Sequence, residues 1–148
     1  MNIKKTANLF INFTLRRLAE VFGLIIFLCG LFLLISLLSY SPEDPNFIFP
    51  DNTEIKNLFG FYGSFISDLF FQSVGIIAFL IASSFIITGI NIFLNKNFFL
   101  LIENTFFIIL YTLLGSIFFS FFYQNAFTLY INGNGGFVGI YLNSTFIG

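Results

Sequence analysis

Histidine and tryptophan are absent from the 148-residue sequence, and cysteine occurs once, as Cys29. Without histidine there is no imidazole base, no Ser-His-Asp triad and no histidine-ligated metal. A single cysteine excludes an intrachain disulfide and a metal site built from several cysteines. These absences exclude most of the common catalytic and metal-binding arrangements.

Charge is also scarce. Charged residues make up 9% of the chain and hydrophobic residues 57%, with a mean hydropathy of +0.95, whereas a soluble domain carries about 25% charged residues. Such a chain cannot cover a surface that faces water, so lipid has to complete its core, and a soluble enzyme is excluded. The net charge of −1 gives no bias toward nucleic acid.

Three long uncharged runs are present. The first lies between Glu20 and Glu43, the second between Asp68 and Lys96, and the third follows Glu103. As a helix the first run is about 33 Å long at 1.5 Å per residue, enough to cross a hydrocarbon core of about 30 Å. We therefore predict an all-α, polytopic α-helical membrane protein. Its three complete transmembrane helices are expected at about 19–41, 69–94 and 104–123.

The segment before the first run carries four of the six basic residues, among them Arg16 and Arg17. Its apolar residues recur at helical spacing, which predicts a basic amphipathic segment over 1–18 that lies on an anionic membrane face. The first apolar run is too long for a signal peptide, so we expect an uncleaved anchor.

The distribution of Lys and Arg predicts the orientation. The N-terminus should be cytoplasmic, with Arg16 and Arg17 as inner anchors. Segment 42–68 then becomes an outer loop and 95–103 an inner turn, where Lys96 and Glu103 could form a weak exposed ion pair. Segment 124–148 is expected to be an outer loop followed by a short helix.

Two prolines and two acids follow the first run directly, at 42–45. Pro42 and Pro45 cannot continue a helix, and Glu43 and Asp44 are costly inside lipid. We predict that Pro42, Asp44 and Pro45 stop the first helix at the outer interface, with Tyr40 at the level of the headgroups.

Asp68 allows two interpretations. It could be an intramembrane carboxylate in an ion or proton path. The favoured alternative is an outer-interface acid near a helix N-terminus, where the helix dipole stabilises negative charge.

Small residues recur at spacings that let membrane helices approach closely. The glycine run at 135–139 lacks the spacing of a nucleotide-binding loop, so a turn is predicted there. The small-residue pairs are Gly23 with Gly30, Ala78 with Ala82, and Ser116 with Ser120.

Three stretches carry a family resemblance in their order and spacing. They are "RRLAEVFGLIIFLCGLFLLISLLSYSPEDPNF" at 16–47, "NLFGFYGSFISDLFFQSVG" at 57–75 and "GGFVGIYL" at 135–142. With them the chain resembles the N-terminal membrane segment of the FtsK/SpoIIIE family of DNA translocases. The residues that carry the match are Arg16, Arg17, Glu20, Pro42, Asp44, Pro45, Asn57, Gly60, Gly63, Asp68, Gly75, Gly136 and Gly139.

The resemblance implies a fourth membrane helix beyond the C-terminus and an ATP-driven motor outside this chain. It implies that the chain is a membrane anchor with a septal-targeting and assembly role in cell division and chromosome partition. Its expected location is the bacterial inner membrane, and its expected partners are the lipid bilayer, further copies of itself and divisome membrane proteins. No catalytic, metal or cofactor residue is expected here, since ATP and Mg²⁺ would belong to the motor, and no direct nucleic-acid binding is expected.

An alternative is a stand-alone small membrane protein, such as a transporter or channel subunit, because polar Ser, Thr and Asn lie inside the apolar runs. A transporter is expected to show convergent intramembrane charges or a pair of helices broken by glycine or proline. The sequence reveals neither.

Overall fold

The computed structural model describes residues 3–45, 54–123 and 132–146, and every regular element within these ranges is a helix. This confirms the all-α prediction. The eight residues 46–53 and the eight residues 124–131, which fall in the two predicted outer loops, lie outside the described residues. The elements are α1 (Ile3–Leu38), α2 (Gly60–Val74), the 3-10 turn η1 (Gly75–Ile77), α3 (Ala78–Asn95), α4 (Phe99–Phe122) and α5 (Gly136–Phe146).

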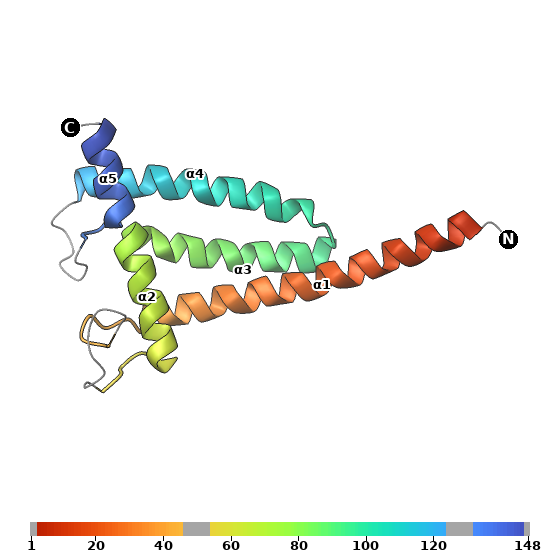
Figure 1. Ribbon diagram of the computed structural model, residues 1–148, viewed down its shortest axis with the longest axis horizontal. Helices are drawn as coiled ribbons and strands as arrows, with labels where there is room; N and C mark the ends of the chain where they lie inside the picture. Colours follow the sequence, from red (N-terminus) through yellow and green to blue (C-terminus); the bar gives the residue numbers. More distant parts are fainter. Residues whose placement is uncertain (1–2, 46–53, 124–131, 147–148) are drawn as a thin grey trace.

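Three long helices run side by side along the molecule (Figure 1). The middle one is α3, which packs on α1 and on α4. At one end α2 lies across the bundle and α5 packs on α4, and we call this the capped end. At the other end α3 turns into α4 at Lys96, and we call this the basic end. There α1 continues past the other helices toward the N-terminus.

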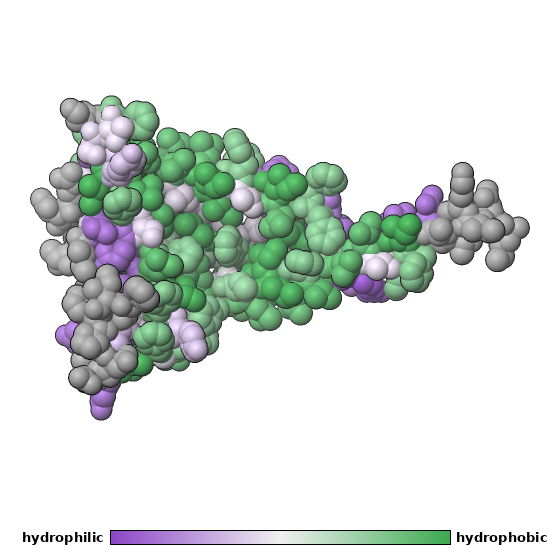
Figure 2. Space-filling view, in the orientation of Figure 1, coloured by the Kyte–Doolittle hydropathy of each residue, from purple (hydrophilic) through white to green (hydrophobic). Residues whose placement is uncertain are grey.

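Three stretches of the described chain are long and apolar enough to cross a membrane: Asn8–Leu38, Gly60–Asn95 and Phe99–Phe122. Large apolar side chains remain exposed along all three, and α4 is the least buried of them. Figure 2 shows the bundle as a continuous hydrophobic surface, with the polar residues gathered toward the ends. The protein is a multi-pass membrane protein, as its composition predicts.

The basic segment and the first span form one helix. At about 1.5 Å per residue, α1 is about 54 Å long, far longer than a hydrocarbon core of about 30 Å. The sequence predicted a boundary near residue 18, but α1 runs from Ile3 to Leu38 without a break. Its N-terminal part projects beyond the bundle in line with the span (Figure 1).

The second predicted span is interrupted, which corrects the predicted segment 69–94 and the outer loop 42–68. Helix α2 begins at Gly60, inside the predicted loop, and ends at Val74, inside the predicted span. Gly75 then adopts a φ of 65°, which reorients the chain before α3 begins at Ala78. Residues with a side chain rarely adopt this φ, so glycine is the residue that permits the break. The sequence does not predict this glycine-broken helix, because the apolar run passes through Gly75 without interruption.

The buried core lies toward the capped end. It forms where the C-terminal part of α1, α2, η1 and the start of α3 meet, and Phe71 and Ala78 are almost fully buried there. Toward the basic end, Ala19 and Ile92 are buried, and glycines let the backbones of α1 and α3 approach closely. A Cβ atom on Gly89 would lie 2.4 Å from the backbone nitrogen of Phe27, and one on Gly30 would lie 2.7 Å from that of Ile86. The predicted role of Gly23 and Gly30 in close helix packing is therefore confirmed.

Candidate functional site

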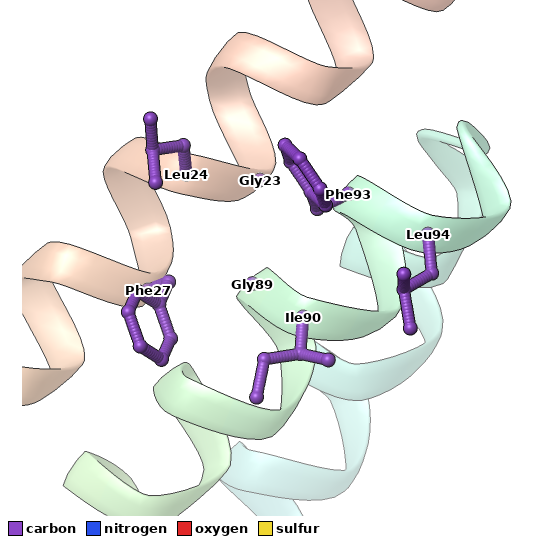
Figure 3. A pocket seen from close by; sticks show the side chains of 7 residues that line it. All are labelled: Gly23, Leu24, Phe27, Gly89, Ile90, Phe93 and Leu94. Atoms are coloured by element: carbon purple, nitrogen blue, oxygen red, sulfur yellow. The ribbon is translucent and has the colours of Figure 1, made fainter.

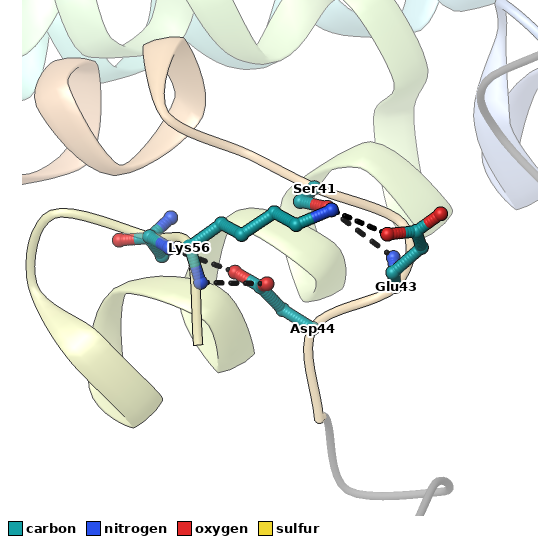
Figure 4. A network of polar contacts seen from close by, with 5 residues as sticks. Ser41, Glu43, Asp44 and Lys56 are labelled. Atoms are coloured by element: carbon teal, nitrogen blue, oxygen red, sulfur yellow. Dashed lines mark hydrogen bonds and ion pairs between the residues drawn. The ribbon is translucent and has the colours of Figure 1, made fainter. Parts of the chain in front are cut away.

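Asp44 connects the two arms of the loop between α1 and α2. Its side chain is only 3% exposed. One carboxylate oxygen accepts the N–H of Lys56 at 2.9 Å, and the other accepts the N–H of Asn57 at 2.8 Å. Lys56 also donates through Nζ to Glu43 (Figure 4). The buried carboxylate thus holds the segment after α1 against the segment before α2.

Asn57 then attaches the start of α2 to α1. Its amide nitrogen donates to the carbonyl of Ser36 at 2.9 Å, and its Oδ1 accepts the N–H of Phe59 at 3.1 Å. A Cβ atom on Gly63 would lie 2.0 Å from that Oδ1, so a side chain at 63 would displace Asn57. The hydroxyl of Ser64 donates to the carbonyl of Pro45 at 3.0 Å. Gly63 and Pro45 are therefore parts of one junction between α1 and α2.

The predicted helix stop occupies the end of α1. The helix ends at Leu38, Pro42 is exposed, and Pro45 and Asp44 are buried. Gly60 has a φ of 61° at the start of α2. Pro42, Asp44 and Pro45 follow the end of α1, and Asp44 and Pro45 also position α2. The sequence did not indicate this second role.

Asp68 is not at a helix N-terminus, and this corrects the prediction. It lies about two turns into α2, since α2 begins at Gly60. It accepts a hydrogen bond from the hydroxyl of Tyr40 at 3.1 Å and a long one from the amide of Gln72 at 3.5 Å. The side chain of Asp68 therefore connects α2 to the end of α1.

A second junction joins the helix break to α5. The N–H of Ile76, freed by the break, donates to the carbonyl of Asn134 at 3.0 Å. A Cβ atom on Gly75 would lie 1.9 Å from that same oxygen, and one on Gly136, whose φ is 63°, would lie 2.6 Å from the carbonyl of Ser73. Only glycine allows these backbones to meet.

The glycine run at 135–139 also packs on α4. A Cβ atom on Gly139 would lie 2.3 Å from the carbonyl oxygen of Ser116, and Ser120 lies beside it. Ser116 in turn donates to the carbonyl of Val74 at 3.3 Å. The run forms a turn and the start of α5, as predicted, and it brings α5, α4 and α2 together.

At the basic end, Glu20 is shared by two cations. Its Oε2 lies 2.6 Å from the guanidinium of Arg17, and its Oε1 lies 2.7 Å from Nζ of Lys96. The predicted pair of Lys96 with Glu103 is wrong, because Lys96 reaches across to α1. The guanidinium of Arg17 lies 5.2 Å from the ring centre of Phe13, and Arg16 is exposed.

The sequence indicated Asn57 only through the family resemblance and did not indicate Asn134, and the hydrogen bonds of neither were predicted. Both are almost fully buried. Buried asparagine in so apolar a chain was the available signal, because buried polar groups in proteins are nearly always hydrogen-bonded.

The ion pair of Lys56 with Glu43 shapes the electrostatics of the capped end. The Lys56 ammonium donates to Glu43 and lowers the pKa of that carboxyl, and Glu43 raises the pKa of Lys56 in return. No group of three or more Cys, Asp or Glu side chains gathers among the residues that the structure describes. The arrangement can hold helix ends in place, and the polar groups bond mainly to one another.

The chain matches known proteins over most of its length. A family described as "4TM region of DNA translocase FtsK/SpoIIIE" matches residues 15–147. A DNA translocase FtsK of Azospirillum brasilense is 34% identical over 87 residues, which are 57% of this chain and 14% of that protein. One from Rickettsia bellii (strain RML369-C) is 35% identical over 78 residues, which are 53% of this chain and 10% of that protein. The matches therefore cover only a small part of these relatives. No solved structure matches the chain.

Proposed function

This chain belongs to the family of the 4TM region of DNA translocase FtsK/SpoIIIE, and from that membership we propose that it anchors an FtsK-like translocase in the membrane. We propose further that it targets the translocase to the division septum and takes part in assembly there, in cell division and chromosome segregation. The observation that carries this proposal is the family match over residues 15–147, which includes both ends of the helix bundle.

The proposed setting is the bacterial inner membrane with the N-terminus in the cytoplasm. Arg16, Arg17 and Lys96 all lie toward the basic end, and positive residues favour the cytoplasmic side. The capped end then lies outside. Its proposed partners are further copies of the chain and membrane proteins of the divisome, while DNA is contacted only by the motor.

We propose that this chain itself is not an enzyme and needs no cofactor. Acid and base catalysis requires two titratable groups within reach of one substrate. Glu20 binds Arg17 and Lys96 at the basic end, whereas Asp68 accepts from Tyr40 at the capped end. Glu20 and Asp68 therefore lie at opposite ends of the bundle and cannot act on one substrate.

Fluorescence microscopy tests the septal role. A tagged copy of the chain should concentrate at midcell in dividing bacteria. Asp44→Asn, which disturbs the buried cap, should reduce the midcell fraction, and Glu43→Gln, the same change at the exposed neighbour, should not. An even distribution of the unsubstituted chain around the envelope would contradict septal targeting.

The size of the native product tests the connection to a motor. An antibody against residues 54–68 should detect a product several times larger than 16.9 kDa in the cells of origin. A stable product near 16.9 kDa would contradict the proposal that a motor is attached, and would favour an independent membrane scaffold.

A further inference from the structure

An apolar groove lies between α1 and α3 near the basic end (Figure 3). Its volume is about 270 Å³. Leu24 and Phe27 on α1 form one wall, and three residues on α3 form the other. The glycines Gly23 and Gly89 lie between the two walls. The α3 residues of the groove are Ile90, Phe93 and Leu94.

The two glycines account for the groove. Gly23 and Gly89 bring the backbones so close that a Cβ on either would lie within 3 Å of the other helix. Because Gly23 and Gly89 have no side chains, a hollow remains beside the point where the two helices touch. The larger lining residues of α1 and α3 border this hollow. Leu24, Ile90 and Leu94 are exposed, so the groove opens to the lipid that surrounds the bundle.

A cluster of charges adjoins the groove. Glu20 precedes Gly23 and Lys96 follows Phe93 by three residues each, an axial distance of about 4.5 Å in a helix. Arg17 and Lys96 give the cluster two cations around one anion, and Arg16, four residues before Glu20, adds a third cation on the same helix face. Glu20 uses one hydrogen-bond donor each of Arg17 and Lys96, whereas a guanidinium carries five donors and an ammonium three. The cluster has both the charge and the donors to bind a phosphate.

We propose that the groove binds an acyl chain of an anionic phospholipid whose phosphate is held by Lys96 and the two arginines. An apolar cavity of about 150 Å³ is enough to bind benzene, so this groove has room for a stretch of hydrocarbon. It is too small for a helix, whose diameter with side chains is about 10 Å. A second copy in the same orientation would bring another net positive cluster to this end, whereas an anionic lipid complements it.

Native mass spectrometry of the purified full chain tests this proposal. The probes are phosphatidylglycerol and phosphatidylcholine with identical acyl chains, titrated separately. Phosphatidylglycerol should bind more tightly. Lys96→Gln should weaken its binding about fivefold, the effect expected for one basic residue at an anionic surface. It should weaken phosphatidylcholine binding less, because the choline ammonium offsets the charge of that lipid's phosphate. Lys56→Gln at the capped end is the matched control and should change neither.

Ile90→Trp tests the groove itself, since the larger side chain fills it from an exposed position. Binding of both lipids should fall, while Ile109→Trp, an exposed position on α4, should leave both unchanged. Circular dichroism and elution volume verify that each variant folds. Equal binding of the two lipids would overturn the proposal, and so would insensitivity to Ile90→Trp. A dimer abolished by Ile90→Trp would assign the groove to a second copy instead. The proposal does not depend on septal targeting, because its test uses only the chain and lipid.

Discussion

Both carboxylate oxygens of Asp44 accept backbone N–H groups, and the side chain is almost fully buried. In Asp44→Asn an NH₂ group takes the place of one of these oxygens. This group is a donor, so it cannot accept the backbone N–H that it faces. Hydrogen bonds to charged groups contribute about 1.5–3 kcal/mol each, so we expect a loss of about that size in the free energy of unfolding. Chemical denaturation in detergent, followed by circular dichroism, measures it. Glu43→Gln is the control, because its carboxylate is exposed, and an equal loss in both would contradict the assignment.

The exposed pair of Glu43 and Lys56 gives a pH prediction. The pKa of Glu43 is lowered from 4.5 and that of Lys56 is raised from 10.5, each by the other. The contribution of Glu43 to stability is present above 4.5 and is lost as the pH falls through its folded pKa. That of Lys56 is present below 10.5 and is lost as the pH rises through its folded pKa. NMR titration should show the Glu43 pKa returning toward 4.5 in Lys56→Gln. An unchanged pKa would contradict the pair.

Single residues show what sequence can and cannot predict here. Pro42, Asp44 and Pro45 were identifiable as a helix stop because proline geometry and the cost of charge in lipid are local properties. The partners of Asp44 lie more than ten residues away, and Lys96 binds Glu20 rather than the nearby Glu103. Such pairs depend on how the helices pack, and no local pattern encodes them.

At the scale of the element, the seam between α1 and α3 depends on its glycines. A Cβ atom on Gly89 would lie 2.4 Å and 2.7 Å from backbone atoms of Phe27, which cannot move without separating the helices. We expect Gly89→Ala to cost about 1–3 kcal/mol, as overpacking typically does. Thermal unfolding in detergent measures the change.

Gly115→Ala in α4 is the matched control for Gly89→Ala. Its Cβ would meet only the side chain of Ile77, nearest at its flexible end. Alanine is also favoured over glycine in a helix by about 1 kcal/mol. Gly115→Ala should therefore be nearly neutral. If both variants lost the same stability, close backbone contact would not be the reason that α1 and α3 pack through glycine.

The break between α2 and α3 gives a third element-scale contrast. Gly75 and Gly60 both have positive φ, but only at Gly75 would a Cβ meet another backbone, the carbonyl of Asn134. Alanine with positive φ is strained by about 1–3 kcal/mol at either site. Gly75→Ala should also speed hydrogen exchange at the Ile76 amide, which donates to Asn134. Gly60→Ala should not, and equal exchange in both variants would contradict the junction.

The long elements were predictable and the break was not, for one reason. Hydropathy measures whether a segment can lie in lipid, and the run between Asp68 and Lys96 is apolar throughout. The conformation of Gly75 is set by its contact with Asn134, 59 positions later in the chain. The apolar runs at 19–41 and 104–123 contain no such contact-driven break, so helices α1 and α4 cover most of them.

At the scale of the whole molecule, the two ends of the bundle differ in structure. The capped end is closed by α2 and α5 over buried polar junctions, whereas the basic end is a short turn with α1 projecting past it (Figure 1). The lateral surface between them is apolar. The polar junctions of the capped end and the charges of the basic end should both lie outside the lipid. We expect the basic residues to decide which end faces the cytoplasm.

Topology mapping tests that orientation. Cys29 is first replaced with serine, and single cysteines are then placed at Leu58, near the capped end, and at Asn97, in the turn of the basic end. Both positions are exposed. A membrane-impermeant maleimide applied to spheroplasts should label position 58 directly and position 97 only after permeabilisation. Replacing Arg16 and Arg17 with glutamate should make a fraction of the chains show the opposite pattern, because positive charge favours the cytoplasmic side and this change reverses it. The double substitution Glu43→Arg, Glu54→Arg at the other end should act in the same direction. If neither double variant changed the labelling of either position, the packing of the apolar helices would set the orientation, and the basic residues would serve only to bind Glu20 and lipid.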